Sequence, residues 1–405
     1  MTASSHANGP TIMLVVGEPS GDALGQQLIL ALRELTHGKA RIIGVGGERM
    51  RAAGMQSLYS ITDTSVMGLR EVVPNIPRIL ARIRQVADFA KANNPDIAVM
   101  IDSPDFTHKV ASRIRRIAPE LKLVDYVAPQ VWASRPKRAL TMAKSFDHVL
   151  CLLPFEVPIF QNVGMGASFV GHPVIERAPR PGQGDAFRAR HGIPRDQKVL
   201  LLLPGSRSNE IRFLWSVFRE AIEQTSAAAG SIRIVLPTVQ NVSASVRKLA
   251  AEWRKDILVV EGPDEKMGAF DAADIALAAS GTVSTELALS TTPMVIGYRV
   301  GALTAAIARR FIKVPYVTLV NIILNREVVP EFIQENCTSA NLSRELIRLL
   351  TNPAARLEQV TATASAVKAM GYGDEAPSMR AAREILRIIK EPRRSPGAAV
   401  SVTEK

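Results

Sequence analysis

The chain has 405 residues, more than one ordinary hydrophobic core accommodates, so we expect two domains. Hydrophobic residues make up 47% and charged residues 22%, which is typical of a soluble globular protein. No apolar run approaches the ~20 residues of a membrane-spanning helix, and the first ten residues lack the apolar stretch of a signal peptide. An integral membrane protein and a secretory leader are therefore not expected.

The chain is basic, with a net charge of +12 and a pI of about 9.9. Such a charge favours nucleic acid, an anionic membrane surface or phosphorylated substrates, although it also serves solubility alone. Aromatic residues are only 5%, without aromatic-basic interleaving, so we expect no nucleic-acid partner. Two cysteines, Cys151 and Cys337, indicate a reducing compartment, and the six scattered histidines predict no metal site.

Strand-like runs alternate with helical patterns, which predicts parallel α/β domains. Candidate strands of the first half are residues 12–16, 41–44, 97–101, 121–127 and 148–153, with helical patterns at 23–35, 79–93 and 109–117. Residues 176–185 are rich in Pro and Gly and predict a linker. A second strand series follows at 199–203, 232–236, 257–260, 275–278 and 293–297, and a helical pattern at 381–389 closes the chain.

The predicted organisation is two doubly wound domains with a cleft between them. We expect a flexible N-terminus (1–10), a first Rossmann-like domain (11–178), a second one (186–372), a closing helix (373–391) and a disordered tail (392–405).

The first candidate site is the loop Gly17-Glu18-Pro19-Ser20-Gly21-Asp22, which follows the first strand. Ligands of open α/β sheets lie beyond such strand ends. The loop lacks both G-x-G-x-x-G and G-K-[ST], and its carboxylates repel phosphate, so it predicts a hydroxylated ligand or proton chemistry. The alternative for Asp22 is a simple helix cap.

A second acidic turn in the first domain contains Asp102 and Asp105, directly after the strand 97–101. A carboxylate at this position can act as general base toward a hydroxyl nucleophile. The alternative is an Asx turn that precedes a helix.

Two further segments of the first domain favour a sugar lipid or an anionic surface. Trp132, with the cations Arg135, Lys137 and Arg138, follows the next strand, and a packed tryptophan beside a basic solvent face is the alternative. Residues 79–86 place an apolar face beside a rim of arginines, which suits a helix on an anionic membrane or an ordinary surface helix. The apolar residues are Ile79, Leu80, Ile83 and Val86, and the rim is Arg78, Arg82 and Arg84.

Two loops of the second domain predict a nucleotide-diphosphate site. Gly205, Ser206 and Arg207 follow the strand 199–203 and place an arginine fork and backbone N–H groups at its end. Ser280, Gly281 and Thr282 begin a helix whose positive dipole end favours a pyrophosphate, and Glu286 one turn later can bind a ribose diol. The alternatives are an exposed turn and an ordinary helix cap.

Polar residues also gather in the otherwise apolar segment 320–334. Buried polar groups need partners, which are either a ligand or an internal hydrogen-bond network. The residues are Asn321, Arg326, Glu327 and Gln334.

Taken together, the motifs resemble the lipid-A-disaccharide synthases, bacterial glycosyltransferases of the GT-B architecture. The ordered set covers roughly residues 10–390 and comprises GEPSGD (17–22), VMGLREV (66–72), DSPDF (102–106), APQVWA (128–133), LPFE (153–156), FVGHP (169–173), LPGSR (203–207), ASGTVSTELAL (279–289) and NREVVPEFIQ (325–334).

The resemblance implies transfer of 2,3-diacylglucosamine from UDP-2,3-diacylglucosamine to 2,3-diacylglucosamine 1-phosphate (lipid X), which gives a β(1→6) disaccharide 1-phosphate and UDP. It implies that Asp105 is the base, with Ser20 and Asp22 beside it, and that the second domain holds the UDP-sugar without a metal or other cofactor. Weaker acceptor contacts are expected from Glu18, Met67, Gly68, Gln130 and Trp132.

The resemblance also implies a cytoplasmic protein attached peripherally to the anionic inner-membrane surface. A homodimer stays an open expectation. The alternative functions are another GT-B UDP-sugar enzyme (an N-acetylglucosaminyltransferase or a UDP-sugar epimerase) and a non-catalytic nucleotide-sugar binding protein.

Overall fold

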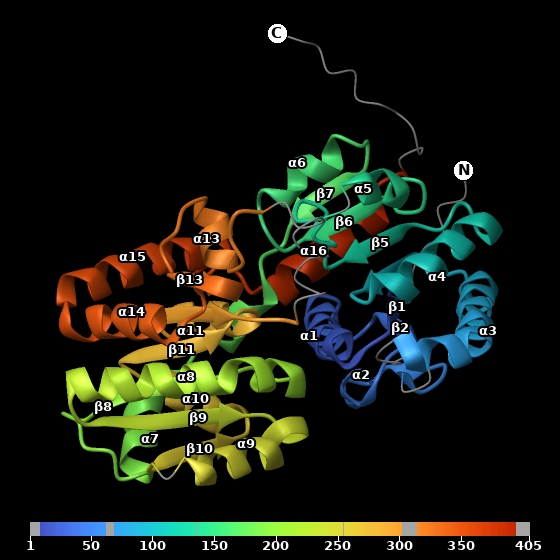
Figure 1. Ribbon diagram of the computed structural model, residues 1–405. Helices are drawn as coiled ribbons and strands as arrows, with labels where there is room; N and C mark the ends of the chain where they lie inside the picture. Colours follow the sequence, from blue (N-terminus) through green and yellow to red (C-terminus); the bar gives the residue numbers. More distant parts are fainter. Residues whose placement is uncertain (1–8, 62–68, 135, 254, 302–313, 394–405) are drawn as a thin grey trace. The chain divides into compact units, whose positions relative to one another are not determined.

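The computed structural model describes residues 9–61, 69–134, 136–253, 255–301 and 314–393. The chain divides into two compact units (Figure 1). Unit 1 comprises Met1–Pro173 and Gly373–Lys405, and unit 2 comprises Val174–Tyr372.

Unit 1 is built on a seven-stranded parallel sheet with the order β3-β2-β1-β4-β5-β6-β7. The strands are β1 (Thr11–Val16), β2 (Arg41–Val45), β3 (Gln56–Ser57), β4 (Ile97–Ile101), β5 (Leu123–Tyr126), β6 (His148–Cys151) and β7 (Gly166–Phe169). Strands β1 and β4 are almost wholly buried and hydrophobic, as strands covered on both faces are. The strand order reverses between these two strands, and ligands of such sheets bind at this point.

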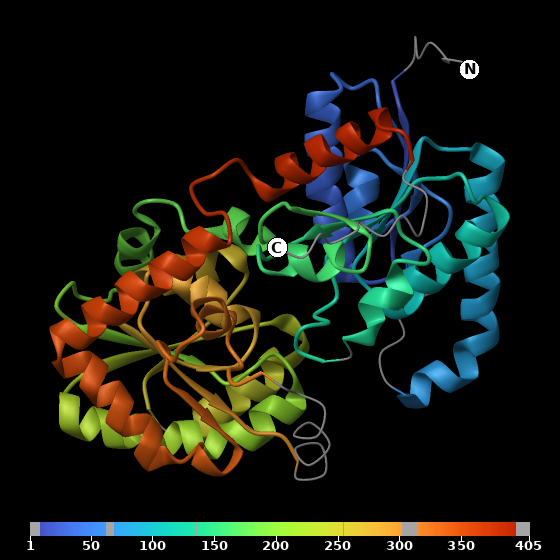
Figure 2. The same cartoon turned by 90° about the horizontal axis from the view of Figure 1, so that it is seen from above.

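Helices lie on both faces of the unit 1 sheet (Figures 1 and 2). They are α1 (Pro19–Leu35), α2 (Glu48–Ala52), α3 (Leu69–Asn93), α4 (Pro104–Ile117), α5 (Lys137–Met142), α6 (Glu156–Gln161) and α16 (Pro377–Lys390). Although α16 comes from the far end of the chain, it packs against α1. Lys122 Nζ donates hydrogen bonds of 2.8 and 2.7 Å to the Ile388 and Ile389 carbonyls, which holds the end of α16 on this unit.

Unit 2 repeats the plan with a six-stranded parallel sheet in the order β10-β9-β8-β11-β12-β13, and its switch point lies between β8 and β11. The strands are β8 (Lys198–Leu203), β9 (Ile232–Thr238), β10 (Ile257–Glu261), β11 (Ile275–Ala279), β12 (Met294–Tyr298) and β13 (Glu331–Ile333). The α-helices are α7 (Gln183–Arg190), α8 (Ser208–Ala229), α9 (Gln240–Glu252), α10 (Pro263–Ala272), α11 (Thr282–Leu289), α13 (Leu319–Leu324), α14 (Ser339–Thr351) and α15 (Pro353–Ala369), and the 3-10 helices are η2 (Pro173–Arg177) and η3 (Gln334–Asn336).

All ten predicted strands are present, with ends within two residues of the predicted ones, whereas the short strands β3, β7 and β13 carry no separate pattern in the sequence. Four helices begin earlier than predicted, among them α16, which begins at Pro377 rather than at residue 381. Helices α1 and α4 begin at Pro19 and Pro104, because proline is tolerated in a first helical turn. Helix α3 begins at Leu69 rather than at residue 79 and continues through Pro74 and Pro77.

The predicted loop 17–22 and linker 176–185 are therefore corrected. Only Gly17 and Glu18 of the first precede α1, and the second contains the end of η2 and the start of α7. The tail prediction for 394–405 lies outside the described residues, and Arg393 forms an ion pair with Asp147 at 3.0 Å.

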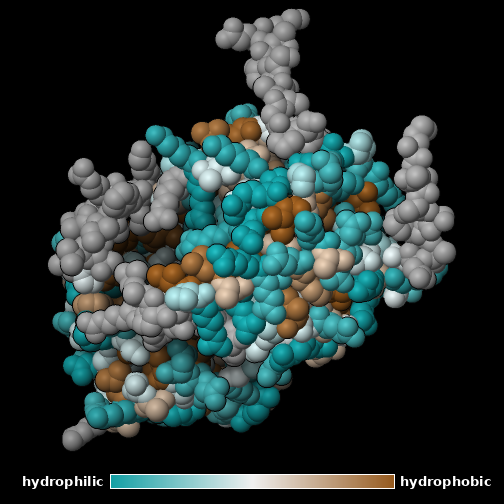
Figure 3. Space-filling model, turned by 90° about the vertical axis from the view of Figure 1, so that its right-hand side faces the viewer, coloured by the Kyte–Doolittle hydropathy of each residue, from teal (hydrophilic) through white to brown (hydrophobic). Residues whose placement is uncertain are grey.

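No helix in the described ranges has the length and apolar character needed to cross a membrane. Figure 3 shows one face of the molecule, on which hydrophobic residues occur as small patches within a mainly hydrophilic surface.

Candidate functional site

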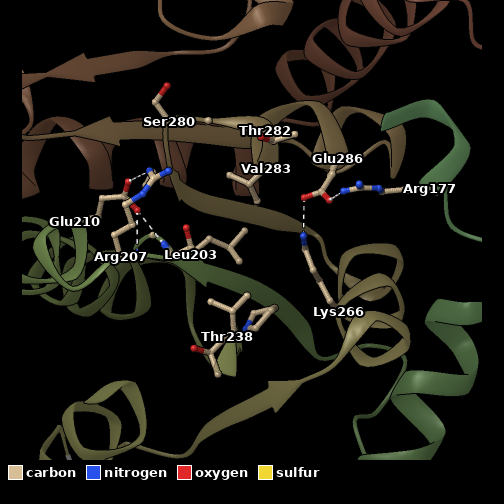
Figure 4. Close-up of a pocket in the computed structure, with 16 residues that line it drawn as sticks. Arg177, Leu203, Arg207, Glu210, Thr238, Lys266, Ser280, Thr282, Val283 and Glu286 are labelled. Carbon is tan, nitrogen blue, oxygen red and sulfur yellow. Dashed lines mark hydrogen bonds and ion pairs between the residues drawn. The ribbon is translucent and has the colours of Figure 1, made fainter. Parts of the chain in front are cut away.

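Unit 2 has a pocket of about 350 Å³ at the carboxyl ends of β8 and β11, which is its switch point (Figure 4). Seven residues predicted for the donor site line it, namely Gly205, Ser206, Arg207, Ser280, Gly281, Thr282 and Glu286. The pocket also contains Arg177, Glu210, Thr238 and Lys266, which the sequence did not point to. Two loops far apart in the sequence thus meet where open α/β sheets bind ligands.

The Gly205 loop folds around Glu210, in the first turn of α8. Oε2 of Glu210 accepts hydrogen bonds from the backbone N–H groups of Ser206 (2.9 Å) and Arg207 (3.3 Å). Oε1 accepts one from Arg207 Nη1 at 2.9 Å. Gly205 has a φ of +117°, and a Cβ there would lie 2.5 Å from Glu210 Oε2, so only glycine fits. The backbone N–H groups of Ser206 and Arg207, predicted to bind phosphate, thus donate to a carboxylate, whereas the Arg207 side chain is 74% exposed.

The second loop presents the N-terminus of α11 to the pocket. Gly281, with a φ of +149°, precedes the first helical residue Thr282, and no side chain caps this helix end. The Ser284 hydroxyl turns back to the Gly281 carbonyl at 2.8 Å. First-turn N–H groups have no intrahelical acceptor and carry the positive end of the helix dipole. This end of the pocket is therefore suited to an anion.

Glu286 lies deeper in the pocket, 5% exposed, on the second turn of α11. Lys266 Nζ on α10 donates a 2.6 Å hydrogen bond to its Oε2, and Arg177 Nη1 lies 4.0 Å from Oε1 (Figure 4). Two cations thus compensate one buried carboxylate, while Oε1 keeps capacity to accept a hydrogen bond. Sequence reasoning missed both cations because the fold alone brings them to this helix.

The predicted cluster in 320–334 does not line this pocket. Asn321 is fully buried, its Oδ1 accepts from the Val328 and Val329 N–H groups, and its Nδ2 donates to the Val329 carbonyl and to Glu331 Oε1. The internal-network alternative therefore describes Asn321. Arg326 and Glu327 are exposed, and Oε1 of the half-buried Gln334 accepts a 3.4 Å hydrogen bond from the Val300 N–H group.

In unit 1, the loops after β1 and β4 converge at the switch point of the sheet. The Ser20 hydroxyl donates a 2.6 Å hydrogen bond to Asp102 Oδ2. Asp102 and Ser103 have left-handed φ values of 57° and 46°, a strained conformation that clusters at functional sites. Partial burial raises the pKa of Glu18, and the charges of Asp102 and Asp105 raise it further, against a hydrogen bond from Ser103. The charges of three acidic candidate residues, Glu18, Asp102 and Asp105, thus influence one another.

Asp105 is at the start of α4 with its side chain 97% exposed, and Arg138 Nη2 lies 3.7 Å from Oδ1. A carboxylate in this position is open to an incoming hydroxyl group.

Asp22 is turned away from solvent. It is 5% exposed and accepts the N–H groups of Gly47 (2.7 Å), Arg49 (3.0 Å) and Met50 (3.1 Å). It therefore caps α2, a neighbouring helix, rather than the helix it belongs to. Both carboxylate oxygens of Asp22 thus accept backbone N–H groups, which favours a structural role, and its predicted catalytic role stays a prediction.

The predicted acceptor contacts differ in their surroundings. Trp132 Nε1 donates a 3.0 Å hydrogen bond to Oε1 of the buried Glu156, whose pKa burial raises, and the ring packs edge-on against Phe155. The packed-tryptophan alternative describes this arrangement. Gln130 is exposed, and Met67 and Gly68 lie outside the described residues.

The apolar face predicted to meet a membrane is mostly core. Ile83 is 5% and Val86 0% exposed, and α3 packs against α4, whereas Leu80 is 51% exposed. Arg82 stacks over the Tyr59 ring at 4.4 Å. The ordinary surface-helix alternative therefore accounts for most of this face.

No group of three or more potential metal ligands occurs among the residues that the structure describes. Cys151 and Cys337 are both buried free thiols.

The chain is similar in sequence to known proteins over almost its whole length. The family described as Lipid-A-disaccharide synthetase matches residues 12–384. The Lipid-A-disaccharide synthase of Rhodospirillum centenum is 44% identical over 378 residues, 93% of this chain and 94% of the relative. That of Bradyrhizobium diazoefficiens is 43% identical over 386 residues, 95% and 97% of the two chains.

Solved structures share the fold at low identity. A putative UDP-N-acetylglucosamine 2-epimerase from Listeria monocytogenes has a TM-score of 0.62 and 13% identity, and covers 94% of this chain and 95% of its own. The S. aureus MnaA-UDP co-structure also has a TM-score of 0.62, with 14% identity and 95% and 98% coverage. The predicted GT-B class with two Rossmann-like domains is confirmed.

Proposed function

We propose that this chain, which belongs to the lipid-A-disaccharide synthase family of glycosyltransferases, transfers 2,3-diacylglucosamine from its UDP derivative to 2,3-diacylglucosamine 1-phosphate. The products are the β(1→6) disaccharide 1-phosphate and UDP. The observation that carries the donor half of this proposal is the unit 2 pocket, where an arginine, a helix N-terminus and a buried carboxylate converge.

The order of groups in the pocket fits a nucleoside diphosphate. Arg207 and the first turn of α11 suit the diphosphate, since a guanidinium and backbone N–H groups both bind phosphate oxygens. Glu286 follows four residues after Thr282, about 6 Å along the helix. This spacing supports a ribose contact to Oε1 of Glu286, since Lys266 bonds to the other oxygen.

The neighbours in fold support a nucleotide-sugar ligand. One of them is titled as a complex with UDP, and another is the Anabaena protein HepE in complex with UDP-glucose, with a TM-score of 0.53. In the proposed reaction the same cationic groups stabilise the departing UDP without a metal ion.

The acceptor reacts through its 6-hydroxyl group. The hydroxyl oxygen bonds to the anomeric carbon, the bond from that carbon to the UDP oxygen breaks on the opposite face, and Asp105 accepts the hydroxyl proton. The exposed carboxylate of Asp105 supports this role, because a base must reach its proton within hydrogen-bond distance. Ser20 and Asp102, joined by a hydrogen bond, position the adjoining loops.

The test is UDP release with defined substrates. We expect turnover with UDP-2,3-diacylglucosamine plus the acylated acceptor, and none with UDP-N-acetylglucosamine plus the same acceptor. Equal turnover with the acetylated donor, or its epimerisation without acceptor, would favour the alternative UDP-sugar enzymes. UDP binding without any turnover would favour a non-catalytic binding protein.

We also propose peripheral attachment to the cytoplasmic face of the inner membrane, since both substrates carry acyl chains and the chain has a net charge of +12. Co-sedimentation with phosphatidylglycerol vesicles, but not with phosphatidylcholine vesicles, is expected. The homodimer stays a prediction, and light scattering, which measures the molar mass in solution, tests it.

A further inference from the structure

Unit 1 contains a second pocket, of about 540 Å³, formed by α3, α4 and α5. Its wall is rich in positive charge and also includes Pro104 and Asp105, at the start of α4. The cationic side chains that line it are Arg84, Lys109, Arg113, Arg116 and Arg138, with His108 beside them.

These cations have little negative charge to balance them. Among the described residues, no carboxylate lies within ion-pair distance of Arg84, Lys109, Arg113 or Arg116, and Arg138 has only Asp105, at 3.7 Å. Arg113 Nε is buried from solvent and has no hydrogen-bond acceptor there.

The neighbouring Arg115 shows the contrast. It bonds to Asp147 at 2.7 Å and to the Ser145, Pro119 and Leu121 carbonyls, so its charge is fully engaged in the fold. Like charges gathered in one pocket repel one another and raise the local potential, which stabilises a bound anion. The pocket is therefore built for an anionic group rather than for packing.

The other part of the wall is apolar. Ile83, Met142 and Phe146 are buried beneath the pocket, and Leu80 on its rim is 51% exposed. His108 packs edge-on against Phe146, with ring centroids 5.0 Å apart. An anion that also carries an apolar part fits this combination.

The pocket is also at the right place for the acceptor. Asp105, Lys109 and Arg116 recur at helical spacing on α4, so they share a face. Lys109 is one turn from Asp105, about 6 Å along the helix. In a pyranose, C1 and C5 both flank the ring oxygen and the 6-hydroxyl is on the exocyclic carbon of C5, so a site for the 1-phosphate must lie within one sugar of the base, as Lys109 does.

We propose that this cationic pocket binds the phosphate monoester of the acceptor sugar and thereby places its 6-hydroxyl at Asp105. The inference rests on the proposed function, which supplies an acceptor with a 1-phosphate. Arginine forks bind phosphate oxygens in pairs, whereas Lys109 contributes a point charge.

The test compares Arg113→Gln/Arg116→Gln with the control Arg51→Gln/Lys91→Gln, which removes two exposed charges of unit 1 outside the pocket. The pocket variant should raise KM for the phosphorylated acceptor at least tenfold, with KM for the UDP-sugar and the thermal midpoint unchanged. With an acceptor that carries a 1-hydroxyl instead of the phosphate, the pocket variant and the wild type should have similar KM values. The control should match the wild type throughout.

The inference is overturned if the pocket variant loses the same factor with both acceptors, or if KM for the phosphorylated acceptor does not change. Loss of phosphatidylglycerol-vesicle binding with an unchanged acceptor KM would also overturn it and would assign the pocket to phospholipid headgroups. A single variant, Lys109→Gln, repeats the comparison if the double variant unfolds.

A binding measurement separates this inference from the proposed reaction. Glucosamine 1-phosphate should bind the wild type, and the pocket variant should bind it at least tenfold more weakly, by calorimetry. If the wild type releases no UDP but still binds glucosamine 1-phosphate through this pocket, the proposed function fails while the phosphate site stands. If turnover occurs and this binding is absent, the phosphate site fails alone.

Discussion

Lys266 Nζ donates a 2.6 Å hydrogen bond to Oε2 of Glu286, and this ion pair joins α10 to α11 inside the unit 2 pocket. Both residues line the pocket, and Glu286 is only 5% exposed. The ion pair therefore fixes both the pocket wall and the orientation of the carboxylate proposed to bind the ribose. Removal of Lys266 leaves the buried Glu286 charge with only Arg177, 4.0 Å away, and the weaker compensation of a buried charge costs more than the pair itself contributes.

Lys266→Met should therefore lower the free energy of unfolding by about 2–4 kcal/mol and raise the UDP dissociation constant at least tenfold. Urea denaturation and calorimetry with UDP measure the two effects. Lys255→Met, an exposed lysine of the same unit outside the pocket, is the control and should change neither. Unchanged UDP affinity in folded Lys266→Met would remove this pair from the site.

Glu210 occupies the N–H groups and the arginine that a diphosphate requires. Its charge opposes an incoming phosphate, whereas its hydrogen bonds order the Gly205 loop. Glu210→Gln removes the charge and keeps an acceptor oxygen, so UDP should bind about threefold more tightly, a difference of about 0.6 kcal/mol. The gain should shrink at high salt. Glu220→Gln, on the exposed side of α8, is the matched control, and weaker UDP binding by Glu210→Gln would contradict the repulsion argument.

Asp105→Asn should reduce kcat by at least about a hundredfold, because the amide cannot accept the hydroxyl proton. UDP binding should stay unchanged, since the donor pocket is built from unit 2 residues. Initial rates of UDP release and calorimetry with UDP measure the two quantities. Asp88→Asn, an exposed aspartate on α3, is the control, and near-normal turnover of Asp105→Asn would assign the proton to another group.

Asp22 accepts hydrogen bonds from three backbone N–H groups, so we expect its removal to lower the stability of the fold. Asp22→Ala leaves these donors buried without an acceptor and should lower the free energy of unfolding by about 2–3 kcal/mol, whereas Asp22→Asn should lose less. Urea denaturation compares the two variants. The activity per folded molecule should persist in Asp22→Asn, and its abolition in a stable Asp22→Asn protein would support the catalytic prediction.

The strands and the donor loops were predictable because local signals determine them. An apolar run followed by Gly-Ser-Arg or Ser-Gly-Thr marks a strand end, and parallel strands place those ends on one edge. Lys266, Arg177 and Glu210 were not predictable in the same way. Their roles depend on which carboxylate or N–H group the tertiary fold brings beside them.

Tertiary contacts also explain why some predicted site residues have other roles in the structure. From the sequence alone, Asp22 can be interpreted as the cap of its own helix. In the structure, it accepts hydrogen bonds from the start of α2 instead. Asn321 is one of several polar residues in an apolar segment, and only the fold shows that Glu331 and two valines satisfy it. The cationic pocket of unit 1 was also missed, because its charges come from three helices.

Asp125 provides a prediction on pH dependence. It is 1% exposed on β5, and His108 Nε2 lies 3.4 Å from its Oδ2. Burial raises the pKa of Asp125, with a smaller increase from the Asp102 charge, against the opposing effects of His108 and Arg138. In the folded state, the Asp125 carboxyl therefore stays protonated at pH values above its unfolded pKa of about 3.9. The stability that this proton preference supplies is present below that value and is lost as pH rises through the folded pKa.

Asp125→Asn stays neutral at every pH and escapes this loss. The thermal midpoint of Asp125→Asn minus that of the wild type should therefore increase between about pH 4 and pH 8. Thermal unfolding at several pH values measures the difference, and Asp88→Asn, which is exposed on α3, should show a flat one. A difference that falls with pH would mean that the His108 contact outweighs burial, so that Asp125 is the charged partner of a buried ion pair.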